Sequence, residues 1–300
     1  MLLDKFNRPL DVIEILAGDE PGGDRSASDT GRDLGQAPSF PSEHIVAFMK
    51  IMSALGLGKA LIAGKEPLLR PDIVDLVSQL SHIRPKVEIT LRTASPLLPK
   101  LIEPLASAGL DRLWVTLPAI DPATYSSITG HDEVGLEQII FGMKLAEQLG
   151  VHTTIEAVRT PGVDQTAMVE AALWGLSRGF AVRIMEGAAF DESGDFFDRT
   201  LEQIGKVCHL EPGEDQYIWN VAGGGPRVEL ITCSRTQNCY ECRKLWLSAE
   251  GKIKLCSHHH EEHDLGEMFD PGSCHSDLLD FAAKIPLNKP QGFFSRTIRE

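Results

Sequence analysis

The sequence contains no apolar run that approaches the length of a membrane span, and no signal peptide opens it. It also lacks an excess of basic residues, because 43 acidic residues outnumber 29 lysines and arginines, for a formal net charge of −14. An acidic surface argues against a nucleic-acid partner and favours solubility. We therefore expect a cytoplasmic protein with neither a membrane nor a nucleic acid as its partner.

Cysteine is scarce, and without a secretory signal we expect metal or thiol chemistry in place of disulfides. Three of the six cysteines follow the spacing C-x2-C-x13-C, at Cys239, Cys242 and Cys256. Residues 244–248 and 252–256 are typical of two short strands with a turn at Ala249–Gly251 between them. This hairpin returns Cys256 to the first pair, so the pattern predicts one metal centre with three thiolate ligands.

The three thiolates leave the identity of the metal open. A [4Fe-4S] cluster held by three cysteines keeps one iron available to a substrate. A structural zinc ion needs four protein ligands, and His258 lies two residues beyond Cys256. The spacing alone therefore predicts a metal site without deciding between iron–sulfur and zinc.

Apolar runs rich in strand-forming residues alternate with amphipathic segments. The six expected strands are Val12–Gly18, Lys59–Gly64, Val87–Thr93, Arg112–Pro118, His152–Val158 and Ala181–Gly187. The expected helices are Ser42–Leu55, Pro71–Ser81, Pro99–Ala108, Gly135–Leu149, Asp164–Arg178 and Asp195–Leu210. Repeated βα units predict an α/β fold, a partial (βα)6 TIM-like barrel of parallel strands, although an open doubly wound sheet fits the same pattern.

Two irregular segments suggest how this fold is divided. Pro21–Ser39 is rich in Gly, Asp and Ser, so we expect a loop or disorder after the first strand. Glu211–Gly213 marks the expected boundary between a barrel over residues 1–212 and a small cluster-binding subdomain over residues 213–300. In a barrel of this kind, function is expected at the carboxyl ends of the strands.

Several short segments, in this order, carry a resemblance to a known family. They are Leu3–Leu10, Glu66–Arg70, Gly109–Leu113, Ile128–Gly130, Arg183–Glu186 and the three spaced cysteines. Together they resemble the radical S-adenosylmethionine enzymes, most closely the GTP cyclase of molybdenum-cofactor biosynthesis (the MoaA family). The resemblance covers nearly the whole chain, and it implies that Cys239, Cys242 and Cys256 hold the family's second, carboxyl-terminal [4Fe-4S] cluster. It favours iron–sulfur over zinc.

The sequence departs from this family where S-adenosylmethionine is cleaved. The family's first strand leads into C-x3-C-x2-C, and counting from Val12–Gly18 places these positions on Pro21, Arg25 and Ser28. None of the three can supply a thiolate to iron. Lys65 also replaces the second glycine of the pair that receives the methionyl group. We therefore expect a single [4Fe-4S] cluster and no S-adenosylmethionine.

The residues that grip the nucleotide triphosphate in the family are also partly replaced. Lys59 and Arg183 match its basic positions, whereas Lys244 and Trp246 stand in place of two arginines. Three further basic positions are occupied by Leu61, Glu14 and Thr154. An uncharged residue does not replace the planar fork of an arginine, so GTP is not the expected substrate. We predict that Lys59, Arg183, Lys244 and Trp246 bind a small substrate.

These features support more than one functional hypothesis. The first is a degenerate enzyme that has lost S-adenosylmethionine cleavage; the open iron of its cluster binds an anionic substrate for lyase-like, hydratase-like or sulfur-transfer chemistry. The alternative is a non-catalytic partner of a biosynthetic enzyme, or a ligand sensor, with a structural metal. The third and least favoured is residual cyclase chemistry on GTP.

Overall fold

The computed structural model describes residues 1–17, 40–159, 164–186, 195–214, 217–232, 242–256 and 261–291. Among these residues the main sheet has 12 strands in the order β14-β13-β12-β3-β4-β5-β6-β7-β8-β11-β10-β9. The strands from β12 through β11 are parallel, and both edges of the sheet are antiparallel. The predicted α/β fold with six consecutive parallel strands is confirmed. Within the described ranges the sheet is curved and does not close into a barrel.

The strands agree closely with the alternation in the sequence. Those of the central sheet are β3 (Val12–Ala17), β4 (Lys59–Gly64), β5 (Glu88–Thr93), β6 (Arg112–Thr116), β7 (His152–Arg159) and β8 (Ala181–Glu186). Those at its edges are β9 (Leu210–Pro212), β10 (Ile218–Val221), β11 (Arg227–Thr232), β12 (Lys244–Leu247), β13 (Lys252–Lys254) and β14 (Glu262–Asp264). A separate ladder pairs β1 (Leu2–Leu3) with β2 (Pro9–Leu10).

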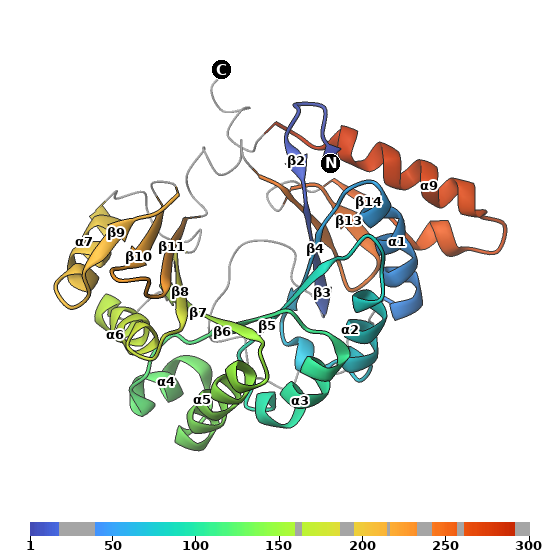
Figure 1. Ribbon diagram of the computed structural model, residues 1–300. Helices are drawn as coiled ribbons and strands as arrows, with labels where there is room; N and C mark the ends of the chain where they lie inside the picture. Colours follow the sequence, from blue (N-terminus) through green and yellow to red (C-terminus); the bar gives the residue numbers. More distant parts are fainter. Residues whose placement is uncertain are drawn as a thin grey trace.

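The helices lie along the outer side of the curved sheet, and β9–β11 and β13–β14 stand at its two ends (Figure 1). They are α1 (Ser42–Ala54), α2 (Ile73–Ser81), α3 (Leu98–Ala108), α4 (Pro122–Thr129), α5 (Glu133–Gln148), α6 (Gln165–Leu176), α7 (Asp195–Gly205) and α9 (His275–Lys284). Short 3-10 turns occupy Pro67–Leu69, Gly266–Phe269 and Ile285–Asn288. No helix in the described ranges is long and apolar enough to cross a membrane.

The two faces of the sheet differ because successive side chains of a strand point to opposite sides. The residues that face the helices are apolar and fully buried, for example Ile62, Leu91 and Val115. Their neighbours, such as Glu14, Arg92 and Glu156, point to the inner face, where they are also buried. The hydrophobic core therefore lies between the sheet and the helices, and the inner face is polar.

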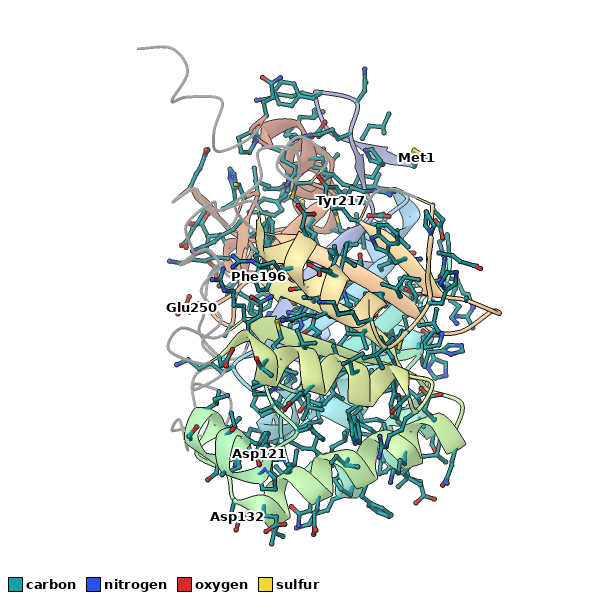
Figure 2. The ribbon with its side chains drawn as sticks, turned by 90° about the vertical axis from the view of Figure 1, so that its left-hand side faces the viewer. Met1, Asp121, Asp132, Phe196, Tyr217 and Glu250 are labelled. Carbon is teal, nitrogen blue, oxygen red and sulfur yellow. The ribbon has the colours of Figure 1, made fainter. Side chains whose placement is uncertain are left out.

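Side-chain caps fix where several helices begin. Asp121 accepts a hydrogen bond from the backbone N of Thr124 at the start of α4, and Asp132 accepts one from Gly135 at the start of α5. Both aspartates lie at one end of the molecule, far from Met1 (Figure 2). Such caps satisfy backbone donors that a helix leaves unpaired in its first turn. The sequence reasoning missed α4, and also β9, β10, β14 and α9.

The carboxyl-terminal residues extend the sheet at both edges. Strand β11 pairs in parallel with β8, while β12 pairs in parallel with β3 on the other side. The expected boundary at Glu211–Gly213 falls on β9, inside the same sheet. The division into residues 1–212 and 213–300 stays a prediction. The expected loop over Pro21–Ser39 lies outside the described residues.

Candidate active site and cysteine hairpin

A buried glutamate holds two arginines together on the inner face of the sheet. Glu156 has a side chain that is 0 % exposed, and its Oε1 lies 2.9 Å from Nη1 of Arg183. Its Oε2 lies 2.7 Å from Nε of Arg92, an ion pair without the alignment of a hydrogen bond. Both guanidinium groups also lie over the ring of Trp114, at 5.2 Å for Arg92 and 3.8 Å for Arg183. Each buried charge at this point therefore has an opposite partner.

The same ion pairs continue outward in both directions. Arg92 donates to Glu14 over 3.1 Å, and Nζ of Lys244 lies 3.6 Å from the other oxygen of Glu14. At the opposite end, Nε of Arg183 donates to Glu229 over 3.0 Å. We call these six residues the ion chain, in the order Lys244, Glu14, Arg92, Glu156, Arg183 and Glu229. It joins β12, β3, β5, β7, β8 and β11.

Strand register explains why these residues share one face. Glu14 is paired with Trp246 on one side and with Leu61 on the other, and Glu156 is paired with Arg183. Paired residues in parallel strands point to the same side of a sheet. Arg183 lies inside β8, as the expected strand Ala181–Gly187 implies.

The four predicted substrate-binding residues all point to this inner face. The structure brings Arg183 and Lys244 into the ion chain. Lys59 lies outside it at the beginning of β4, with its side chain 51 % exposed and its Nζ 4.0 Å from Glu88. Trp246 is half-buried on β12, with the ammonium of Lys289 5.4 Å from its ring centroid. A substrate role for these four residues stays a prediction.

A buried acid lies at the carboxyl ends of the strands. Glu66, just after β4, accepts hydrogen bonds from the hydroxyl of Thr93 and from the backbone N of Leu68 and of Ala94, at 2.7, 3.0 and 3.1 Å. Burial raises the pKa of Glu66 to about 7, although these donors oppose the rise. A buried acid with a raised pKa is a frequent feature of functional sites. Lys65, which precedes it, is half-buried beside the end of β4.

The cysteine hairpin lies at the other end of the strands. Cys242 comes two residues before β12, whose first residue Lys244 is paired with Val12 at the beginning of β3. Strands β12 and β13 form the predicted antiparallel hairpin, and Cys256 follows β13 as a buried thiol. Cys242 and Cys256 therefore lie near the amino ends of the parallel strands, opposite to the end where we expected function.

Sequence reasoning missed a buried lysine beside these thiols. Lys289 is 2 % exposed, and its Nζ donates to the carbonyls of Lys244 and Leu255 over 2.7 and 2.5 Å. The same Nζ lies 3.6 Å from Sγ of Cys242. Burial lowers the pKa of the ammonium, while the nearby charges of Cys242 and Cys256 oppose that effect. The ammonium of Lys289 is therefore positioned to compensate the negative charge of thiolate ligands at Cys242 and Cys256.

The first residues of the chain hold this lysine segment in position. Arg8 donates to the carbonyls of Pro290 and Gln291, each over 2.6 Å, and forms a 2.6 Å ion pair with the fully buried carboxylate of Asp4. Asp4 also accepts hydrogen bonds from the backbone N of Phe6 and of Arg8. The sequence Asn-Lys-Pro around Lys289 is typical of a surface loop. Its buried position is therefore visible only in the structure, through contacts such as those of Arg8 with Pro290 and Gln291.

Several residues named from the sequence lie outside the described residues. They are Cys239 and His258 at the predicted metal centre, and Pro21, Arg25 and Ser28 at the family's S-adenosylmethionine cluster. Within the described ranges, no group of three or more His, Cys, Asp or Glu residues is arranged to hold a metal ion. Two of the three predicted thiolates do lie around one lysine, a donor set that suits an iron–sulfur cluster or zinc. The metal ligation stays a prediction.

Comparisons with known proteins identify the family. The model of the radical SAM superfamily matches residues 24–174, just over half of the chain. The chain is 27% identical over 270 residues to the GTP 3',8-cyclase of Thermodesulfovibrio yellowstonii, covering 85% of this chain and 83% of that protein. It is 28% identical to the probable GTP 3',8-cyclase of Pyrococcus abyssi, covering 97% and 99%. The predicted resemblance to the MoaA family is confirmed.

Solved structures agree on the fold. Streptococcus suis SuiB bound to S-adenosylmethionine has a TM-score of 0.62 and 15% identity, with 93% of this chain and 65% of that chain covered. SuiB bound to its precursor peptide SuiA gives a TM-score of 0.65 and 14% identity, with 94% and 66% covered. The chain thus spans about two thirds of SuiB, and the likeness concerns the fold.

The comparisons correct our functional prediction. We expected a degenerate protein without S-adenosylmethionine cleavage, working by lyase-like or sulfur-transfer chemistry or as a non-catalytic partner. That prediction is wrong, because the superfamily model matches and the relatives bear the names GTP 3',8-cyclase and probable GTP 3',8-cyclase. It relied on Pro21, Arg25 and Ser28, which lie outside the described ranges, and on Lys65, whereas the likeness to these two relatives covers 85% and 97% of the chain. Neither the single cluster nor the absence of S-adenosylmethionine is confirmed. The chain belongs to the radical SAM superfamily, whose cofactors are a [4Fe-4S] cluster and S-adenosylmethionine.

Proposed function

We propose that this protein is an enzyme of the MoaA type that uses the superfamily's cofactors on a small substrate at the inner face of the sheet. The observation that carries the proposal is the ion chain. It places buried and half-exposed charges on the concave side, between the Glu66 end and the Cys242 end of the parallel strands. Burying charged groups costs desolvation free energy even when they are paired, and clusters of such groups are frequent at functional sites.

Cys239, Cys242 and Cys256 would hold a [4Fe-4S] cluster, with zinc as the alternative metal. No cysteine precedes Cys208, so the hairpin thiolates are the cysteine ligands that we assign to iron. Lys289 would place its ammonium against the bound thiolates. When bound, the superfamily's cofactors supply the reductive cleavage of S-adenosylmethionine. The chain's own residues would orient the substrate with Arg183 and Lys244 and keep water from it with Trp114 and Trp246.

The function is tested on anaerobically reconstituted full-length protein. Iron and sulfide are quantified, and 5'-deoxyadenosine is measured after incubation with S-adenosylmethionine and dithionite, with and without GTP. We expect a brown protein, with 5'-deoxyadenosine formed at a rate that Cys256→Ser lowers at least tenfold. Cys274→Ser is the matched control, since Cys274 is exposed and lies outside the spaced motif. A zinc-loaded colourless protein, or one that neither binds nor cleaves S-adenosylmethionine, would overturn the proposal.

A further inference from the structure

Resting on the proposed cluster at the cysteine hairpin, we propose that the first residues of the chain are part of that metal site. Arg8 is a positioning residue, which holds Lys289 against the thiolates without being a ligand itself. We call residues 1–11 the amino-terminal arm. Loss of its grip would make the ligand cysteines more accessible and would leave the cluster without its neighbouring cation.

Lys289 bridges the two sides of the cysteine hairpin. Its Nζ donates to the carbonyl of Lys244 in β12 and to the carbonyl of Leu255, which directly precedes Cys256. The same Nζ lies 3.6 Å from Sγ of Cys242. One buried ammonium thus contacts the segments that carry both thiols, so its position affects how the two thiols lie relative to each other.

Arg8 holds the backbone that follows this lysine. Its two terminal nitrogens donate to the carbonyls of Pro290 and Gln291, each over 2.6 Å, and its Nε lies 2.6 Å from the carboxylate of Asp4. The arginine side chain is only 10 % exposed, and the carboxylate is fully buried. Because a guanidinium presents its donors in a rigid planar fork, one side chain ties two successive carbonyls to a fixed point in the arm.

The arm also holds the other side of the site. Oδ2 of Asp11 lies 2.9 Å from Nη2 of Arg243, and the backbone N of Asp11 donates to the carbonyl of Arg243 over 3.2 Å. Arg243 is the residue directly after Cys242. The arm therefore contacts the sequence neighbours of both Cys242 and Lys289, through two separate sets of bonds.

The arm is itself anchored on the fold. Leu2 and Leu10 are paired in the ladder of β1 and β2, and Leu10 is 1 % exposed within the hydrophobic core. The amino-terminus packs against the turn after α1, where a Cβ on Gly56 would lie 2.7 Å from the backbone N of Met1. An anchored arm can transmit the position of Arg8 to the lysine segment.

The first test measures how fast iodoacetamide alkylates each cysteine of the full-length protein after a chelator has removed its metal. Cys256 is 9 % exposed, and the exposed Cys274 serves as the internal reference. Arg8→Gln should let Cys256 react about tenfold faster, because losing a hydrogen bond from a charged group favours local opening. Arg84→Gln is the matched control, since this exposed arginine also donates to two backbone carbonyls.

The second test separates positioning from a general loss of stability. The midpoint potential of the reconstituted cluster is measured by paramagnetic resonance in Arg8→Gln, in Lys289→Met and in the double variant. Arg8→Gln should shift the potential to more negative values, and it should add no further shift once Lys289 is replaced, because it acts through that lysine. Asp4→Asn removes the charge that holds Arg8 and keeps its shape, so it should change potential and alkylation in the same direction by less.

Two results would overturn the inference. The first is an alkylation rate of Cys256 that is the same in wild type, Arg8→Gln and Asp4→Asn. The second is a midpoint potential that Arg8→Gln leaves unchanged, or shifts equally with and without Lys289. Where Arg8→Gln does not fold, Asp4→Asn decides. A colourless, zinc-loaded protein refutes the proposed function, whereas alkylation of the metal-free protein still decides this inference.

Discussion

Buried charges in the middle of the parallel strands are stabilised differently from those at the two ends of the strands. In the middle, Glu156 has a guanidinium on either side, so charge meets charge. At the ends, Glu66 is surrounded by hydroxyl and N–H donors, and Lys289 mainly by carbonyl acceptors, so charge meets dipoles. Removal of one charge from an ion pair leaves its partner charge buried without a counter-ion. Removal of a charge that is held by dipoles leaves only neutral groups unpaired. The middle should therefore be the more sensitive region.

The largest effect is expected for Glu156→Ala. It leaves Arg92 and Arg183 without their shared carboxylate in a buried place, and breaking a buried pair in this way costs about 3–5 kcal/mol. Urea unfolding of the purified protein measures the loss. Glu229→Ala is the matched control, because this carboxylate is 34 % exposed and contacts Arg183 as the last residue of the ion chain. We expect it to lower the free energy of unfolding by about 1 kcal/mol or less. Equal losses of unfolding free energy for the two variants would show that the buried Glu156 contributes no more to stability than the partly exposed Glu229.

Glu66→Gln should change the pH dependence of stability. Burial raises the pKa of Glu66 from 4.5 to about 7, so the folded protein holds this proton more tightly than the unfolded chain. The stability from Glu66 is then complete below about pH 4.5, falls as the pH rises, and is constant above about pH 7. The total change is on the order of 3 kcal/mol. The variant should lack this slope when urea unfolding is measured from about pH 5 to about pH 8.

Asp72→Asn is the control for this slope. Although burial opposes it, hydrogen bonds from Arg70 and Ser42 lower the pKa of Asp72 below 3.8. The stability from Asp72 is therefore lost only as the pH falls through that lower range. Between about pH 5 and about pH 8 its variant should run parallel to wild type. If Glu66→Gln also runs parallel to wild type, Glu66 is ionised throughout and its donors outweigh its burial.

Lys289→Met should cost about 2 kcal/mol, since it leaves the buried carbonyls of Lys244 and Leu255 without their donor. With a cluster reconstituted on the hairpin, loss of the cation beside Cys242 should also shift its midpoint potential to more negative values, measured by paramagnetic resonance during a redox titration. Lys284→Met, at a lysine 72 % exposed, should change neither quantity. An unchanged potential in Lys289→Met would separate this lysine from the metal centre.

The contrast between these sites also shows what the sequence can reveal. The strands were predicted within a few residues because their outward-facing side chains are apolar and alternate with polar ones, as Ile13, Glu14 and Ile15 do. Glu66 was named only as the first residue of the segment Glu66–Arg70, one of those that carry the family resemblance. Arg183 and Lys244 were predicted to bind a substrate through the same family resemblance, and the structure places both on the inner face. In each case a nearby pattern carried the information.

What the sequence could not give depends on contacts between distant segments. Lys289 touches residues 34 to 47 positions away, and Arg8 reaches across more than 280 positions to hold its neighbours. Glu156 had a visible signal, a glutamate inside an apolar strand, but its two arginine partners come from separate strands. No spacing rule relates such residues, because only the assembled sheet brings them together.

The smallest effect tests the comparison at the surface, where water should weaken charge pairing most. Lys86 is 66 % exposed and lies 2.6 Å from Asp111, which also accepts a hydrogen bond from the backbone N of Ile89 over 2.9 Å. Lys86→Met should cost only about 0.5 kcal/mol, because an exposed ion pair adds little. Asp111→Ala should cost about 1–2 kcal/mol, because it also leaves a backbone donor unpaired. Both variants remove the ion pair, and only Asp111→Ala also removes the hydrogen bond from Ile89, so urea unfolding of the two measures the backbone contact by difference. Equal losses would show that the ion pair accounts for the whole effect even in water.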